Sequence, residues 1–303
     1  MSQRLSLQAL NRVLASLDAA RNGRALYALL AAFCMGGLLL ASAESALARG
    51  DSLWGAVWSG LALAVAFFGV NTTGLLLMDQ ARGLPVREVD DAFVDALFSA
   101  HRVLLCLLLV LALAGGAVAV LVALLWAVHL PWIGTPLFGL LVPLGVVMLG
   151  LMAFCAVVLV GPLTGPSVWA GRSAKETAAM LWRQARHGLL ETAALMVAVL
   201  LLSGAATAAI SFVVISGGRA LALLSVMLLG IDVPPQQLMA GLFGYGLRSL
   251  GAAGAPVAGT PLGMAALVGG GVVFALALVL PTLIYLRGCC AVYLALQYDD
   301  DSL

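Results

Sequence analysis

Six long apolar stretches, separated by short segments that hold most of the charged residues, set the pattern of this chain of 303 residues. An α-helix needs about 20 apolar residues to cross the roughly 30 Å hydrocarbon layer of a bilayer. Strands would be about half as long and would alternate polar with apolar side chains. The pattern therefore predicts an all-α, polytopic membrane protein. Its expected spans are 25–47, 53–78, 103–129, 136–160, 189–217 and 262–286.

The composition supports this class. Hydrophobic residues make up 63% of the chain and charged residues 10%, and the mean hydropathy is +1.11. A water-soluble fold has too little interior to cover so much apolar surface. A net charge of +1 argues against binding to nucleic acid, which requires a strongly basic surface. The expected partners are membrane lipids, with a protein partner or a second copy of the chain as further possibilities.

Orientation follows from the basic residues, because cytoplasmic loops carry an excess of Arg and Lys. With both termini in the cytoplasm, twelve of the fifteen basic residues fall on the cytoplasmic side, and only Arg49, Arg219 and Arg248 fall outside. Segment 1–24 is then a cytoplasmic N-terminal segment and 288–303 a cytoplasmic tail. Fourteen of the fifteen basic residues are Arg, a bias typical of GC-rich bacterial genomes, so we expect a bacterial inner membrane.

Two interpretations of the N-terminal region remain open. The apolar run from Ala25 to Leu40, followed by Ala46-Leu47-Ala48, is compatible with a cleaved secretory signal. The residues before this run instead favour an amphipathic helix lying at the cytoplasmic membrane surface. The residues on its apolar face are Leu7, Leu10, Val13, Leu14 and Leu17.

The two main cytoplasmic links have opposite charge, acidic in 79–102 and basic in 171–187. In the first link, apolar residues recur at helical spacing opposite acidic ones, which predicts an amphipathic surface helix. The apolar set is Val86, Val89, Phe93 and Leu97. We expect a matching helix in the second link, docked on the first through Asp91 and Asp95 against Arg183 and Arg186. The alternative is two separately solvated faces, since exposed ion pairs contribute only about 0–1 kcal/mol.

The chain contains a possible two-fold pseudo-repeat. The second span ends in Asn71-Thr72-Thr73-Gly74 and the fourth in Gly161-Pro162-Leu163-Thr164-Gly165-Pro166, and each is followed by a charged link. Helix ends attract Gly and Pro in any polytopic protein, so independent origin is the alternative. Outside the membrane, segment 218–261 is mostly apolar but broken by Pro234-Pro235, which predicts a re-entrant or interfacial segment.

Polar residues within spans are the candidate functional residues, since burying them in lipid is expensive. Asn71 and Glu191 both lie near the cytoplasmic ends of spans, where they are expected to share a polar contact with Arg102 or Arg186. These four residues form the candidate polar site. The alternative is that each makes an ordinary capping or helix-to-helix hydrogen bond.

No catalytic, cofactor-binding or metal-binding pattern is present. The sequence has no zinc-protease helix, no Gly-x-Ser-x-Gly elbow and no Walker lysine. Its five cysteines lack Cys-x-x-Cys spacing and resemble small core residues, although Cys289-Cys290 forms a pair. His101 and His187 share the cytoplasmic side, which leaves haem ligation as a minor alternative. Pro143 and Pro281 are expected to interrupt the fourth and sixth spans.

Part of the chain resembles known proteins. Segment 71–87, with Gly74-Leu75-Leu76-Leu77-Met78-Asp79-Gln80-Ala81-Arg82-Gly83, together with Gly161-Pro162, Pro166-Ser167-Val168-Trp169 and Gly171-Arg172, resembles uncharacterised multi-pass inner-membrane proteins of proteobacteria. The paired spans joined by amphipathic helices are also similar to the membrane module of some glycerophosphodiester phosphodiesterases, without their catalytic domain. Neither resemblance assigns an activity to particular residues.

These observations predict a protein that acts without catalysis, as a scaffold, anchor or assembly factor in the membrane. The first alternative is a small-solute or lipid transporter, which is favoured if Asn71 and Glu191 line one cavity. A membrane enzyme acting on lipids is the second, and its only support is the acidic link from Asp79 to Asp95. Such acidic runs are more often solvated surface.

Overall fold

The structure is a computed structural model that describes residues 11–129, 134–229 and 261–300. Helices account for nearly all of these residues, and no strand occurs among them. The elements, in chain order, are η1 (Ala15–Arg21), α2 (Gly23–Ala48), α3 (Ser52–Ala81), α4 (Val89–Ala127), α5 (Gly134–Cys155), the π-helical turn η2 (Ala156–Val160), α6 (Gly161–Trp169), α7 (Ala174–His187), α8 (Leu189–Leu229) and α10 (Pro261–Asp300).

Three helices end in the same glycine-dependent cap. Gly50, Gly83 and Gly171 follow α2, α3 and α6 with φ angles of 85°, 71° and 95°. Only glycine adopts this left-handed conformation without strain. In each case the amide after the glycine bonds back to a carbonyl five residues earlier, as from Leu84 to Asp79 and from Arg172 to Ser167. These are Schellman caps, which satisfy the last carbonyls of a helix and turn the chain sharply.

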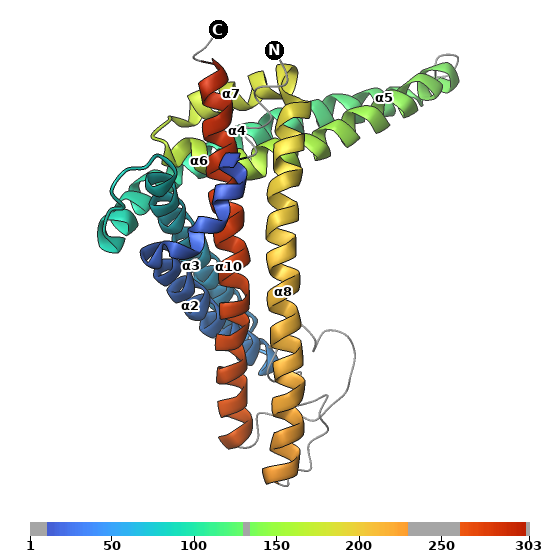
Figure 1. Cartoon of the computed structure of the whole chain (residues 1–303). Coiled ribbons are helices and arrows are strands. Elements are labelled where there is room, and N and C mark those ends of the chain that lie inside the picture. Colours follow the sequence, from blue (N-terminus) through green and yellow to red (C-terminus); the bar gives the residue numbers. More distant parts are fainter. Residues whose placement is uncertain (1–10, 130–133, 230–260, 301–303) are drawn as a thin grey trace.

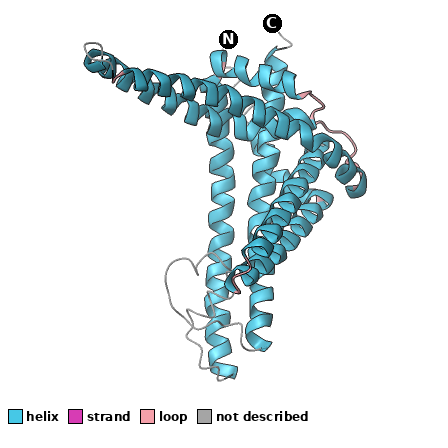
Figure 2. Cartoon of the chain, turned by 180° about the vertical axis from the view of Figure 1, so that it is seen from behind, coloured by secondary structure: helices cyan, strands magenta, loops and turns pink. Residues whose placement is uncertain are grey.

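The helices pair into three hairpins that diverge from one another (Figure 1). The first is α2 with α3, the second is α4 with α5, and the third is the long pair of α8 with α10. The view from behind shows the same divergence, with the α4–α5 hairpin projecting away from the α8–α10 pair (Figure 2). Among the described elements, α5 packs on α4 and on the π-helical turn that continues it.

Most of the core lies where the hairpins meet, and we call this region the core end. Here η1, the end of α3, the start of α4, α6, α7, the start of α8 and the last part of α10 contact one another. Its largest fully buried side chains include Leu76, Leu77, Met78, Leu159, Leu163, Val199, Leu283, Val292 and Tyr293. The two links predicted to be cytoplasmic both lie at this end. The structure thus gathers segments that the sequence predicted to share one side of the membrane.

Six helices of the described residues are long and apolar enough to cross a membrane, which confirms the all-α fold class. They differ in how much of each is covered by protein. In the most apolar 18-residue stretch, 6% of residues are buried in span Leu189–Leu221, against 67% in Ala275–Gln297. The spans Val89–Ala127 and Gly134–Trp169 resemble the first of these, at 11%. The described part of the chain therefore leaves most residues in the apolar stretches of these three spans unburied.

Several boundaries differ from the sequence prediction. The acidic first link is not a separate helix, because α4 runs unbroken from Val89 into the third span. Its buried face consists of Ala92, Ala96 and Ala100, while the expected apolar residues Phe93 and Leu97 are about half exposed. Small alanines permit closer helix packing than bulky side chains do, and this decides which face turns inward.

The last helix also departs from expectation. The predicted tail from residue 288 is the continuation of α10 to Asp300, and it contains some of the most buried residues of the molecule. Both α5 and α10 continue through their prolines, Pro143 and Pro281, while the fourth span changes to a π-helical turn at 156–160. Helix α8 continues to Leu229, so residues 218–229 of the predicted re-entrant segment are part of this helix. The remainder of that segment, 230–260, lies outside the described residues.

Candidate functional site

The polar centre of the core end is a hydrogen bond between α3 and α6. The indole Nε1 of Trp169 donates to Oδ1 of Asn71 at 2.9 Å, and both residues are buried. Asn71 also donates through Nδ2 to the carbonyl of Phe67 at 2.8 Å. A buried amide and a buried indole each need such a partner, because an unsatisfied polar group in an apolar interior is costly. This bond joins the ends of the two candidate repeats.

Two glycines make room for the Trp169 ring. A Cβ atom added to Gly74 would lie 2.3 Å from ring atom Cζ2, and one added to Gly165 would lie 2.8 Å from the same atom. Distances this short do not occur between real side chains, so the ring fits only because both positions lack a side chain. Gly74 and Gly165, which the repeat pattern singles out, therefore serve one packing contact.

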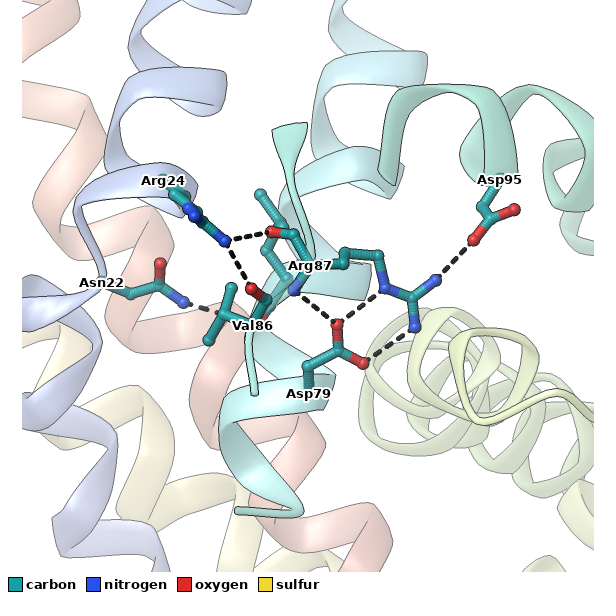
Figure 3. A network of polar contacts seen from close by, with 7 residues as sticks. Asn22, Arg24, Asp79, Val86, Arg87 and Asp95 are labelled. Carbon is teal, nitrogen blue, oxygen red and sulfur yellow. Dashed lines mark hydrogen bonds and ion pairs between the residues drawn. The ribbon is translucent and has the colours of Figure 1, made fainter. Parts of the chain in front are cut away.

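A second polar cluster joins α3 to α4 (Figure 3). Arg87, in the link between them, donates from Nε to Asp79 Oδ2 at 2.7 Å and from Nη2 to Asp79 Oδ1 at 2.8 Å. Its Nη1 donates to Asp95 Oδ2 at 2.6 Å. The side chain of Asp79 is 8% exposed and that of Asp95 is 57% exposed. The hydrogen bonds with Asp79 raise the pKa of the Arg87 guanidinium above its ordinary value, so this arginine stays charged.

Arg24 connects α2 to the same cluster through hydrogen bonds. Its Nη1 donates to the carbonyl of Arg87 at 3.0 Å and to that of Val86 at 2.5 Å, which Figure 3 shows from close by. At the start of α2, Asn22 accepts from the amide of Ala25 at 3.1 Å and so caps the helix. The acidic link is therefore held by its own Arg87 and by Arg24 of α2.

The structure does not bring the four residues of the predicted polar site together. Asn71 is buried against Trp169, whereas Arg102, Arg186 and Glu191 are all exposed. The guanidinium of Arg186 lies over the ring of Trp182, 4.6 Å from its centroid. The expected contact fails because Asn71 satisfies its oxygen with an indole 98 residues away, a partner that its neighbours in sequence do not reveal.

The expected docking of the two links is found in part. Helices α4 and α7 are in contact. The ion pair of Asp95, however, is with Arg87 rather than with the basic link. Helix α7 is a separate element with a capping box, in which Ser173 accepts from the Glu176 amide and Glu176 accepts from the Ser173 amide. This bond lowers the pKa of Glu176 below its ordinary value.

The groups weighed from the sequence for metal, redox or haem chemistry lie as follows in the described residues. No cluster of three metal-ligating side chains occurs among the described residues. Cys289 and Cys290 are both buried, and no disulfide joins them. His101 and His187, the pair considered for haem, are exposed. Sequence reasoning missed Trp169 as the hydrogen-bond partner of Asn71. It also missed the ion pair of Asp79 with Arg87, for which the short spacing of the two residues across the turn at Gly83 was a usable signal.

No family model, curated protein or solved structure matches the chain. Its class therefore rests on the structure itself, with six apolar helices long enough to span a bilayer and no strand in the described residues. The chain is an all-α, multi-pass membrane protein. The resemblance to proteobacterial membrane proteins stays a prediction.

Proposed function

We propose that the protein is a non-catalytic scaffold or anchor of the bacterial inner membrane, and that its uncovered spans bind a transmembrane helix of a protein partner or of a second copy. The observation that carries the proposal is the α4–α5 hairpin, which packs on the other described helices mainly through the start of α4, from Ala92 to Cys106, while few residues of its apolar stretches are buried. A hairpin that packs on other helices at one end and is exposed along the rest of its length presents a long apolar face to the membrane.

Glycines on the bare helices support helix binding rather than lipid contact alone. Gly115 and Gly116 in α4 and Gly204 in α8 are exposed, and a Cβ added to any of them would meet nothing within 4 Å. Glycine within a helix is destabilising unless its small size is used. In membranes that use is the close approach of another helix. These positions therefore suit an incoming helix, and none of the described helices packs on them.

The transport alternative is less well supported. It would be favoured if Asn71 and Glu191 lined one cavity, and neither residue lines either of two cavities that the described residues form at the core end. Both cavities lie at the core end rather than midway along the spans, where transporters bind their substrates. The proposed orientation, with both termini in the cytoplasm, places the core end at the cytoplasmic surface.

Site-specific photocrosslinking in native membranes tests the proposal. A photoreactive residue at Val120 in α4 or Phe212 in α8, which are 61% and 74% exposed, should give one discrete protein adduct. Gly116→Leu should abolish the Val120 adduct, because the larger side chain blocks close helix approach. Leu190, exposed at the core end of α8, is the matched control position. Adducts with lipid alone at both test positions would refute the scaffold proposal.

A further inference from the structure

A cavity of about 220 Å³ opens at the core end, between the N-terminal segment, the end of α3 and the last part of α10. One arginine from each segment lines it: Arg12, Arg82 and Arg287. The other lining residues are small or apolar, and no acidic side chain of the described residues is among them. The volume is below the roughly 300–1,000 Å³ of sites for drug-sized ligands, so it suits a small charged group.

Arg287 is the most unusual residue of this cavity. It lies on α10 within an apolar stretch, and only 9% of it is exposed. Its buried Nε has no hydrogen-bond partner, and it takes part in none of the ion pairs found among the described residues. Asp18 acts on it through space, but Asp18 is itself paired with Arg21 at 3.1 Å. A buried guanidinium without an anion is expensive, so a bound anion would stabilise this arrangement.

Arg82 provides a second, oriented group at the rim. It follows α3 directly, and its Nη2 donates to the carbonyl of Ala170 at 3.2 Å. This bond uses one of the five N–H groups of the guanidinium and holds its plane in place. The planar fork of an arginine matches two oxygens of a phosphate group better than an ammonium does.

The position of the cavity relative to the membrane indicates which class of ligand it binds. The candidate span of α3 ends at Ala81, next to Arg82. The sequence pattern predicts that the sixth span ends at residue 286, next to Arg287, although the apolar part of α10 continues to Gln297. Because Arg82 and Arg287 line one cavity, we infer that both lie near the depth where these spans meet the headgroup region. Basic pockets between helices at this depth suit the headgroups of anionic lipids.

We propose that the Arg12–Arg82–Arg287 cavity binds a phosphate group, and that this phosphate is carried by the headgroup of an anionic phospholipid. The buried Arg287 supplies the charge at the base of the cavity, and Arg82 and Arg12 contact the phosphate oxygens from the rim. The alanines that line the cavity leave room for the group. This site is separate from the uncovered spans proposed above for helix binding.

Binding of short-chain phospholipids to the purified full chain in neutral detergent tests the proposal. Phosphatidylglycerol should bind saturably, and phosphatidylcholine, whose choline offsets the phosphate charge, should bind much more weakly. Arg82→Gln should weaken phosphatidylglycerol binding about ten-fold or more, because a charge-assisted pair of hydrogen bonds is lost. Arg102→Gln removes an exposed arginine that does not line the cavity, and it should leave binding unchanged.

Arg287→Met gives a second readout that separates binding from a structural role. Without added lipid this variant should melt at the same or a higher temperature than the wild type, because it removes an unpaired buried charge. It should also lose the thermal stabilisation that phosphatidylglycerol gives to the wild type. A variant that melts lower without lipid yet keeps that stabilisation would assign Arg287 a structural role and overturn the proposal.

Inorganic phosphate identifies the source of the phosphate group. If it competes with phosphatidylglycerol only at far higher concentration, the lipid headgroup is the ligand. If it binds as tightly, the cavity takes a soluble phosphate and the lipid part of the proposal is wrong. The absence of saturable binding by either compound, or an equal loss in Arg102→Gln and Arg82→Gln, would overturn the site altogether.

Discussion

At the residue scale, Arg87 shows how burial determines the contribution of an ion pair to the stability of the fold. It contacts two carboxylates at nearly the same distance, but Asp79 is buried and Asp95 is mostly exposed. Water screens the exposed pair, so its contribution to stability is small. Asp79 cannot be hydrated in place, and its charge depends on the two bonds from Arg87.

This difference predicts unequal effects of two neutralising substitutions. Arg87→Gln should lower the free energy of unfolding by about 3 kcal/mol, near the lower end of the range for a broken buried pair because Arg87 is partly exposed. Asp95→Asn should lower it by about 0–1 kcal/mol. Adding Asp79→Asn to Arg87→Gln should recover part of the loss. The measurement is reversible unfolding in mixed micelles, and equal losses from both single variants would contradict the argument.

At the scale of elements, the end of α3 is buried, whereas most of its first part is not. From Asn71 to Asp79 every residue is buried, including two threonines whose hydroxyls bond to carbonyls one turn earlier. Those bonds let polar side chains sit inside the core without an outside partner. Gly74 then allows the Trp169 ring of α6 to approach the helix closely.

The close approach can be tested with one methyl group. Gly74→Ala should destabilise the protein by about 1–3 kcal/mol, because the rigid, hydrogen-bonded Trp169 ring cannot move aside without strain. Gly60→Ala is the matched control, since it lies on the same helix and its Cβ would meet nothing within 4 Å. It should be neutral or slightly stabilising. Thermal unfolding in detergent measures both, and a neutral Gly74→Ala would argue against the packing described here.

At the scale of the whole molecule, the contacts that join the hairpins gather at one end. Hairpins joined at one end can approach other helices in the membrane while the core end stays intact. Three candidate spans of the described chain, Ser52–Ala81, Val89–Ala127 and Gly134–Trp169, separate the α2–α3 turn at Asp51 from the start of α7, which places these two positions at opposite ends of the helices. The distribution of basic residues then makes the α7 end cytoplasmic.

This orientation predicts the labelling of two single-cysteine variants on a cysteine-free background. Asp51→Cys should react with a membrane-impermeant thiol reagent in intact cells, because the turn faces outward. Lys175→Cys in α7 should react only after the membrane is permeabilised. Both native residues are exposed, so access rather than burial decides the result. The reverse pattern would refute the orientation, and labelling of both from one side would refute the three membrane crossings between Asp51 and Lys175.

The sequence by itself determined the fold class and the positions of the six spans, because lipid admits only long apolar helices and each of them is visible as a run of residues. It also predicted which links share a side, since charge marks the cytoplasmic ends. Only the tertiary structure decided which faces are buried. In an apolar helix the side toward lipid and the side toward protein have similar residues. The sequence therefore could not show that the alanines of α4 are buried or that most of α8 is exposed. The Trp169 partner of Asn71 and the cavity that Arg82 and Arg287 line together were equally hidden, because each brings together residues far apart in the chain and depends on how the hairpins pack.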